Sequence, residues 1–395
     1  MQKKPELLAP AGSLKKLKTA FIYGADAVYV GNSVFGLRKY SQNLSLLELK
    51  QGLEYAHNLN KKVYLAINGY AHDSDLKELE NYLKELNTCS PHALIIADIG
   101  VLQLAKQTTN IPIHISTQAS TTNLYGCKLC KKNGAKRVIL AREVPLKDCT
   151  HIKNHLDIEL EIFIHGAMCA GYSGKCVMSN YTSARDANRG GCVQNCRHLF
   201  SIENKESTHL MNSKDLMTIK QIPEIIKSGI DSVKIEGRMK SELYVANTTS
   251  IYRDAIDICY EAVSKNQKIS KSKLTRHQKQ LQKVSNRTFY EGCIKKFPPQ
   301  YSINYNFGGY QKKIEFLGSV IEIINNKNII VAVKAPFKTN DKLEILCKNL
   351  KVLKYKATKI KLLNDQEIEK TRPNMVVKLP FIDYAHKGSI LTARI

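Results

Sequence analysis

The chain has 395 residues and a formal net charge of +25, with 43% apolar and 24% charged residues, which is an ordinary globular balance. This length suits one large domain with a smaller one, and no stretch approaches the roughly 18 uninterrupted apolar residues of a membrane span. The N-terminal residues lack an apolar signal region, so we expect a cytoplasmic protein without a membrane partner. The positive charge favours a polyanionic partner such as nucleic acid, although a Lys-rich proteome would produce the same bias.

Short apolar runs alternate with amphipathic stretches through residues 1–265. Such alternation is typical of parallel strands that are joined by helices. Helical patterns lie between the first strands, at residues 13–23, 45–58, 74–86 and 99–107. Eight strand–helix units of this length predict the α/β class and a TIM-like (β/α)8 barrel. The expected strands are Leu7–Ala9, Ala27–Val30, Val63–Ile67, Ala93–Ala97, Ile113–Ser116, Arg137–Leu140, Leu160–Ile164 and Ser232–Ile235.

Polar or charged residues directly follow most of these strands, at the rim where the active sites of such barrels lie. Glu143, His165 and Glu236 are candidates for proton transfer. Asn68 and Gln118 are candidates for hydrogen bonding to a base. Residues at strand ends also simply begin loops, and His165 could equally be a buried histidine that supports the loop after it.

Four of the 11 cysteines lie in an insertion at residues 165–197, between the seventh and eighth predicted strands. They are Cys169, Cys176, Cys192 and Cys196, with the spacing C-x6-C-x15-C-x3-C. Four thiolates can close around one metal centre, and soft ligands favour zinc or an iron–sulfur cluster. Structural zinc usually shows two close cysteine pairs, whereas only the last pair is close here. The spacing therefore favours a cluster and leaves zinc as the alternative.

Arginine is scarce in this chain, with 12 residues among the 60 basic ones, so a local cluster of it calls for an explanation. Arg185, Arg189 and Arg197 lie among the cysteines, and Arg238 follows the eighth predicted strand. The planar guanidinium fork suits carboxylate and phosphate groups. These four residues are therefore candidates for binding a carboxylate or phosphate group of a substrate. The competing interpretation is a salt bridge to a nearby acidic residue.

The C-terminal third changes character twice. Residues 266–300 begin with a basic run without acidic residues, which suits a linker or helix that touches RNA, or a solvated tether. Residues 301–395 carry short β-prone runs, and Asn325-Asn326 is typical of a hairpin turn. We expect a small β-barrel-like domain there, after a barrel domain at residues 1–265.

Several segments resemble the peptidase U32 family, also called collagenase-like proteases. The likeness covers most of residues 5–260, is most specific in the cysteine block, and is weaker in the C-terminal region. The matching segments are Glu6–Gly12, Gly24–Gly31, His114–Gln118, Glu161–Arg197, Leu210–Leu216 and Val233–Ser241.

The likeness is greatest to the branch of this family that hydroxylates transfer RNA. That resemblance implies prephenate-dependent conversion of a tRNA wobble uridine to hydroxyuridine, with tRNA and prephenate as partners. It also implies a 4Fe–4S cluster on the four cysteines and leaves room for a protein partner in the hydroxylation pathway. Two other functions stay open: a peptidase that acts on collagen-like substrates, and a non-catalytic cluster-binding partner of a hydroxylase. No nucleophile–base or zinc-peptidase motif in the sequence supports the peptidase.

Overall fold

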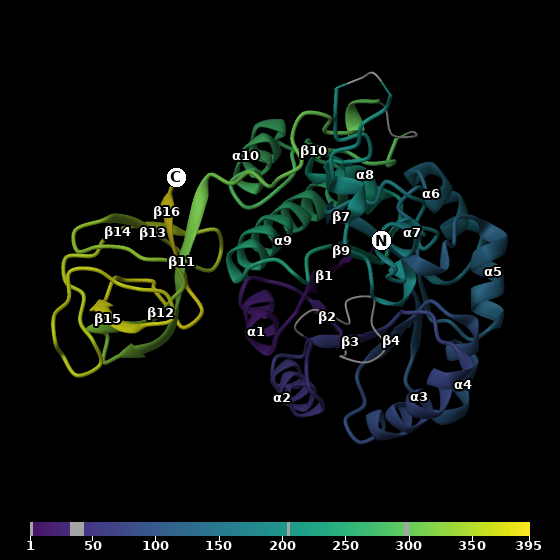
Figure 1. Cartoon of the computed structure of the whole chain (residues 1–395), viewed down its shortest axis with the longest axis horizontal. Coiled ribbons are helices and arrows are strands. Elements are labelled where there is room, and N and C mark those ends of the chain that lie inside the picture. Colours follow the sequence, from purple (N-terminus) through teal and green to yellow (C-terminus); the bar gives the residue numbers. More distant parts are fainter. Residues whose placement is uncertain (1–2, 32–42, 204–205, 296–299) are drawn as a thin grey trace.

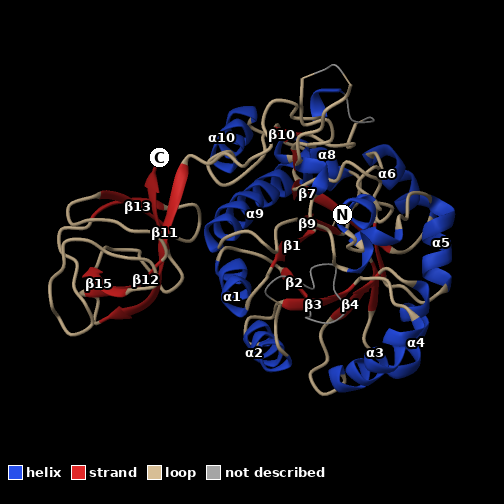
Figure 2. Cartoon of the chain, in the orientation of Figure 1, coloured by secondary structure: helices blue, strands red, loops and turns tan. Residues whose placement is uncertain are grey.

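The computed structural model describes residues 3–31, 43–203, 206–295 and 300–395. Figures 1 and 2 show a central ring of strands surrounded by helices, with a smaller all-β unit beside it. Parallel pairing runs from β1 through β7, and β9 pairs with both β7 and β1, so the ring is closed. This confirms the predicted TIM-like barrel and its eight strands. They are β1 (Glu6–Pro10), β2 (Ala27–Gly31), β3 (Lys62–Ile67), β4 (Ala93–Ile96), β5 (Ile113–Ile115), β6 (Arg137–Ile139), β7 (Glu159–Gly166) and β9 (Ser232–Ile235).

Helices on the outside of the ring begin where the sequence supplies caps. The Ser45 hydroxyl accepts the backbone N–H of Glu48, and the Glu48 carboxylate accepts the backbone N–H of Ser45, which is a reciprocal capping box. The Asp98 carboxylate accepts the N–H groups of Gly100 and Val101 in the same role. The helices are α1 (Leu14–Ile22), α2 (Leu46–His57), α3 (Asp73–Leu86), α4 (Ile99–Thr108), α5 (Leu124–Lys132), α6 (Leu146–His155), α8 (Ile222–Lys227) and α9 (Glu242–Ser264).

The strands alternate between two apolar environments. Leu7 and Ala9 pack outward against the helices, whereas Leu8 points into the ring with Tyr29 and Phe163. This alternation follows from the two-residue period of a strand.

The interior of the ring also holds buried charges. Glu161 is fully buried and accepts from Arg137 at 3.0 Å and from Lys234 at 3.1 Å. Arg137 continues to Glu6 at 2.6 Å and to Glu159 at 2.8 Å. A chain of alternating charges therefore runs through the barrel and ends with Lys234.

Two short strands were not predicted. β7 is longer than its neighbours in the ring, and its last residues, His165 and Gly166, pair antiparallel with β8 (Asp215–Met217). β8 in turn pairs with β10 (Phe289–Tyr290). The long connection between β7 and β9 is therefore fastened to the ring by backbone hydrogen bonds at its far end.

The basic run after α9 contains α10 (Lys271–Leu281). Leu274, His277 and Leu281 are buried and turn towards the barrel domain. The opposite face exposes Lys271, Lys273, Arg276 and Lys279. The helix thus presents a positively charged outer face.

The C-terminal unit is an antiparallel sheet in the order β14-β13-β16-β11-β12-β15. Asn325 and Asn326 adopt left-handed backbone angles between β11 and β12, which confirms the predicted hairpin turn. The Tyr23 hydroxyl donates to the Leu346 carbonyl at 2.7 Å and so joins α1's end to this sheet. The strands are β11 (Ile314–Ile324), β12 (Asn328–Val333), β13 (Lys342–Leu346), β14 (Val352–Lys356), β15 (Val376–Pro380) and β16 (Ile390–Arg394). Among the described helices, none combines the length and apolar character that crossing a membrane requires.

We predict that Glu161→Ala lowers the free energy of unfolding by about 3–5 kcal/mol, because it leaves two buried cations without their shared carboxylate. Urea denaturation followed by circular dichroism measures the loss. The matched control is Glu80→Ala, which removes the exposed partner of Lys84 on α3 and should cost about 0.5 kcal/mol or less. Equal losses in the two variants would show that the buried network adds nothing beyond a surface pair.

Candidate active site

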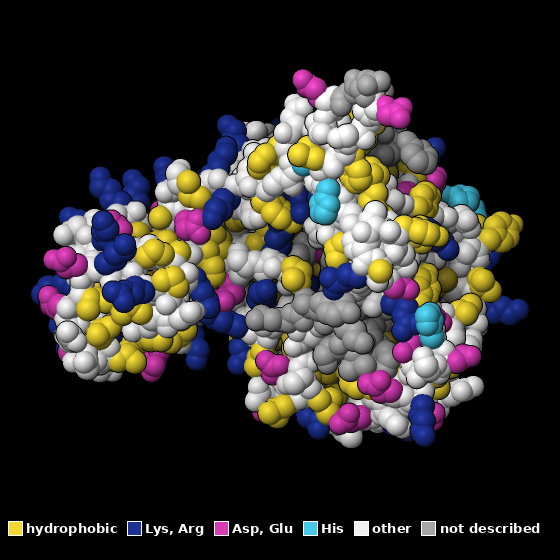
Figure 3. Space-filling view, in the orientation of Figure 1, with side chains coloured by type: hydrophobic (Ala, Val, Ile, Leu, Met, Phe, Trp, Pro, Cys, Tyr) yellow, Lys and Arg dark blue, Asp and Glu magenta, His cyan; other side chains and the backbone are white. Residues whose placement is uncertain are grey.

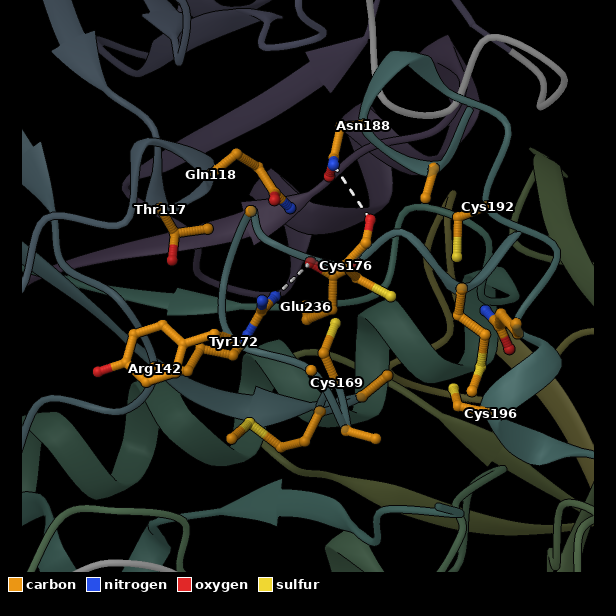
Figure 4. A pocket seen from close by; sticks show the side chains of 18 of the residues that line it. Thr117, Gln118, Arg142, Cys169, Tyr172, Cys176, Asn188, Cys192, Cys196 and Glu236 are labelled. Atoms are coloured by element: carbon orange, nitrogen blue, oxygen red, sulfur yellow. Dashed lines mark hydrogen bonds and ion pairs between the residues drawn. The ribbon is translucent and has the colours of Figure 1, made fainter. Parts of the chain in front are cut away.

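A cavity of about 570 Å³ opens at the C-terminal mouth of the barrel. Residues at the ends of the barrel strands form its floor, and the cysteine segment forms its wall. Strand-end residues that the sequence predicted therefore line the same cavity as the predicted metal-binding cysteines. Figure 4 shows the four cysteines grouped on one side of the cavity, with Gln118 and Arg142 on the other. A hollow of this size suits a small organic ligand or a single base.

The first half of the cysteine segment is tied to the rim through Ser173. The Glu143 carboxylate accepts from the Ser173 backbone N–H at 3.1 Å and from its hydroxyl at 3.2 Å. The Ser120 hydroxyl donates to the Ser173 carbonyl. The neighbouring Gly174 has a φ of 72°, and a Cβ there would lie 1.9 Å from the Gln118 carbonyl, so only glycine permits this approach.

The second half of the segment is held by buried amides. Asn195 donates to Thr182 at 2.6 Å and to Ser183 at 2.9 Å. The Asn188 side chain donates to the Cys176 carbonyl at 3.1 Å, as Figure 4 shows. These bonds position the thiol-bearing loop without help from a regular sheet.

All four predicted metal ligands line the cavity, and none is in a disulfide. Cys169 and Cys192 are exposed, whereas Cys176 and Cys196 are half-buried. Burial raises the pKa of the Cys196 thiol, the Arg197 guanidinium lowers it, and the other three thiols raise it again. Within the described ranges, no three His, Cys, Asp or Glu side chains converge closely enough to hold a single metal ion.

The predicted arginines of this segment have other partners. Arg189 pairs with Asp75 at 2.9 Å and does not line the cavity. Arg185 does not line it either. Arg197 lies at its edge, but its guanidinium donates to Asn212 at 2.9 Å and to two backbone carbonyls, which holds loops together. Salt bridges and loop contacts therefore compete with the predicted anion binding at Arg189 and Arg197.

Two predicted proton-transfer residues also lie outside the cavity lining. Glu143 is occupied with Ser173. His165 is 1% exposed and is packed among Tyr244, Tyr252 and Phe289. Burial, aided by the Lys240 cation, lowers the pKa of His165 to about 3. This neutral, buried histidine matches the structural alternative for His165 better than the catalytic one.

The other predicted residues do meet at the cavity, namely Asn68, Gln118, Glu236 and Arg238. A Cβ at Gly31 would lie 1.5 Å from Nη1 of Arg238, so the glycine that ends β2 makes room for this arginine.

Sequence reasoning missed Arg142 and Lys234, which also line the floor. Lys234 lies within an apolar strand, where a lysine without an acidic partner is rare. This unusual position was the sequence feature that could have marked Lys234 as a candidate. Arg142 follows a predicted strand, as polar residues do at most of the strands, so the sequence did not single it out. Burial lowers the pKa of the Lys234 amine, and the Glu161 carboxylate raises it in opposition.

The sequence model of peptidase family U32 matches residues 12–304. The chain is 40% identical over 362 residues to tRNA hydroxylation protein P1 of Bacillus subtilis, which covers 87% of this chain and 83% of that protein. It is 39% identical over 344 residues to an uncharacterized protease of Methanocaldococcus jannaschii, which covers 82% of each. It is 31% identical over 355 residues to a 23S rRNA 5-hydroxycytidine synthase of Escherichia coli, which covers 87% of this chain and 52% of that protein.

The buried His165 makes stability depend on pH. Its pKa is about 3 in the folded chain and near 6.5 when unfolded, so only the unfolded chain takes up this proton between those values. The stability that the neutral His165 contributes is fully present above pH 6.5. As the pH falls below this value, the free energy of unfolding decreases by about 1.4 kcal/mol per pH unit. We predict that His165→Phe flattens the decline in unfolding free energy between pH 6 and pH 4 by about that slope. Urea titrations at several pH values measure it, and unchanged slopes would mean that folded His165 is protonated.

Proposed function

We propose that this chain, which belongs to peptidase family U32, is an RNA-modifying enzyme that hydroxylates a wobble uridine of transfer RNA. The observation that carries the proposal is the 40% identity to a tRNA hydroxylation protein across most of both chains. An rRNA hydroxycytidine synthase among the relatives supports hydroxylation of an RNA pyrimidine as the shared chemistry. We place this work in the cytoplasm, where tRNA is found and thiols stay reduced.

The mouth cavity suits a base that has left its stack. An enzyme that acts on a base within an RNA loop must bring that base into a pocket. The amides of Asn68 and Gln118 line the cavity and offer both donors and acceptors to a base edge. Glu236 is the carboxylate within the described lining and is our candidate for moving a proton. The exposed cations of α10 offer contacts to the RNA backbone.

We further propose that Cys169, Cys176, Cys192 and Cys196 hold a 4Fe–4S cluster. The donor set fits, because four soft thiol groups border one cavity and none is consumed in a disulfide. Zinc is less favoured, because structural zinc sites usually have two close cysteine pairs, whereas only Cys192 and Cys196 are close in sequence here. A bound cluster would supply one-electron chemistry beside the base.

Hydroxylation replaces a C–H bond of the base by C–OH and removes two electrons, so the reaction needs a co-substrate. We propose that the reaction depends on prephenate as a co-substrate, on the strength of the resemblance to the tRNA-hydroxylating branch. A small organic acid is compatible with a cavity of about 570 Å³, since ligand sites span about 300–1,000 Å³.

A peptidase is the second candidate, because one relative carries that name. Peptide hydrolysis by a cysteine needs a base within hydrogen-bonding reach. Among the described residues that line the cavity there is no histidine, and both His114 and His165 are buried elsewhere. This arrangement favours the RNA-modifying enzyme.

The cluster proposal predicts brown protein with about four irons per chain after anaerobic purification. Serine at any of the four cysteines should remove more than half of the iron and the visible absorption. The matched control is Cys89→Ser, a half-buried cysteine at the far end of α3, which should keep both. Colourless protein with about one zinc per chain would instead establish the alternative metal.

The RNA proposal predicts that a strain without this gene lacks hydroxyuridine in its tRNA. Nucleoside mass spectrometry measures the modification, and the wild-type gene should restore it. Glu236→Gln should leave it near background if this carboxylate moves a proton in the reaction. Unchanged hydroxyuridine in the deletion strain, with no second gene of the family present, would refute this function.

A further inference from the structure

Arg142 stands out among the charged groups of the cavity floor. Its side chain is 7% exposed and lines the cavity. The guanidinium lies flat against Phe163, with 4.1 Å from its carbon to the ring centroid. It approaches Glu236 through Nη2 at 3.5 Å, as Figure 4 shows. That distance exceeds the 2.7–2.9 Å of a charge-assisted hydrogen bond, so the pairing is weak.

The remaining nitrogens of Arg142 have no acceptor. Nε and Nη1 are both buried, and no described side chain or backbone group accepts a hydrogen bond from either. Together they carry three N–H hydrogens. Leaving donors of a charged group buried and unsatisfied is costly, and native proteins rarely do so away from a ligand site. The cavity beside them is the space in which an acceptor would sit.

The described ionic side chains around the cavity carry a surplus of positive charge. Arg142, Arg197, Lys234 and Arg238 line it, whereas Glu236 is the carboxylate within the described lining. Lys234 is paired with Glu161 at 3.1 Å and is therefore largely neutralised. The surplus favours a negatively charged group beside Arg142.

We propose that Arg142 anchors a subsite on the cavity floor that binds the carboxylate of a small organic acid. The acid's body would lie against the aromatic rings of Tyr29 and Phe163, both of which line the cavity. The subsite deepens the proposed function and rests on it for its role in the reaction. Its occupancy can nevertheless be measured without RNA.

A phosphate of the RNA fits this place less well. A phosphodiester would have to carry its two sugars down to a side chain that is 7% exposed. A phosphate monoester would bring nearly two negative charges next to the Glu236 carboxylate, which already lies 3.5 Å from Arg142. A planar carboxylate also matches the planar guanidinium fork.

Ligand-observed NMR titration of the anaerobically purified full-length protein tests the subsite with three probes. Phenylpyruvate presents a carboxylate on an aromatic body, its methyl ester removes the charge, and uridine 5′-monophosphate offers a phosphate. We expect binding of phenylpyruvate, and Arg142→Gln should weaken it by about tenfold or more. The ester should bind the wild type no better than phenylpyruvate binds that variant.

Glu236→Gln provides a test in the opposite direction. It removes the negative charge 3.5 Å from Arg142 and should therefore tighten phenylpyruvate binding several-fold. This arm decides the matter even if Arg142→Gln fails to fold. Arg372→Gln, on the exposed surface of the C-terminal sheet domain, is the matched control and should change nothing.

Three outcomes would overturn the subsite. They are no binding of phenylpyruvate to the wild type, binding that is unchanged both by folded Arg142→Gln and by folded Glu236→Gln (or by Glu236→Gln alone if Arg142→Gln does not fold), or binding of uridine 5′-monophosphate that depends on Arg142 while binding of phenylpyruvate does not. The NMR titration measures only ligand binding and does not depend on hydroxyuridine formation. Failure of the subsite and failure of the proposed function are therefore told apart.

Discussion

The buried carboxylate of Glu161 is the constraint on which the floor of the cavity depends. It lies at the centre of the barrel, fully excluded from solvent, and it holds Arg137 and Lys234 at hydrogen-bonding distance. Burying three charges is expensive, and apolar residues of equal size often give comparable stability. The network instead fixes the position of Lys234 at the cavity floor. Lys234 can stand within an apolar strand and face the cavity because Glu161 neutralises it from below.

The wall of the cavity is built on a different principle. The floor consists of parallel strands, whose backbone hydrogen bonds are made within the ring. The cysteine segment has no sheet partner for most of its length and is held by side chains, as the bonds of Asn195 and Asn188 show. Metal binding is thermodynamically coupled to local folding. A metal centre bound by the thiols would therefore also stabilise the fold of this segment.

Much of this architecture was predictable, because buried parallel strands appear as apolar runs that end in polar residues. All eight barrel strands were identified in this way. β8 and β10 were missed, because three and two residues respectively carry too little pattern to be distinguished from a loop. The four cysteines were found from spacing alone, since their chemistry is rare. The arginine candidates were chosen largely by nearness in sequence to the cysteines: Arg197 and Arg238 line the cavity, Arg189 pairs with Asp75 on α3, and Arg142, which was not proposed, also lines the cavity. Such pairings depend on contacts between distant segments.

The floor and the wall meet at Ser173. Its hydroxyl accepts the backbone N–H of Arg142 at 3.2 Å and donates to Glu143, so it is bonded to two consecutive residues of the loop after β6. Ser173 is 1% exposed and lies between Cys169 and Cys176 in the chain. The loop that carries these thiols is therefore hydrogen-bonded directly to the backbone of Arg142. The Arg142 guanidinium in turn packs over the ring of Phe163, so one hydrogen-bonded contact joins the thiol loop to the residue on the cavity floor. Glu143 was predicted as an acid or base. In this structure its carboxylate accepts hydrogen bonds from the backbone N–H and the hydroxyl of Ser173, and so holds the cysteine segment against the barrel rim.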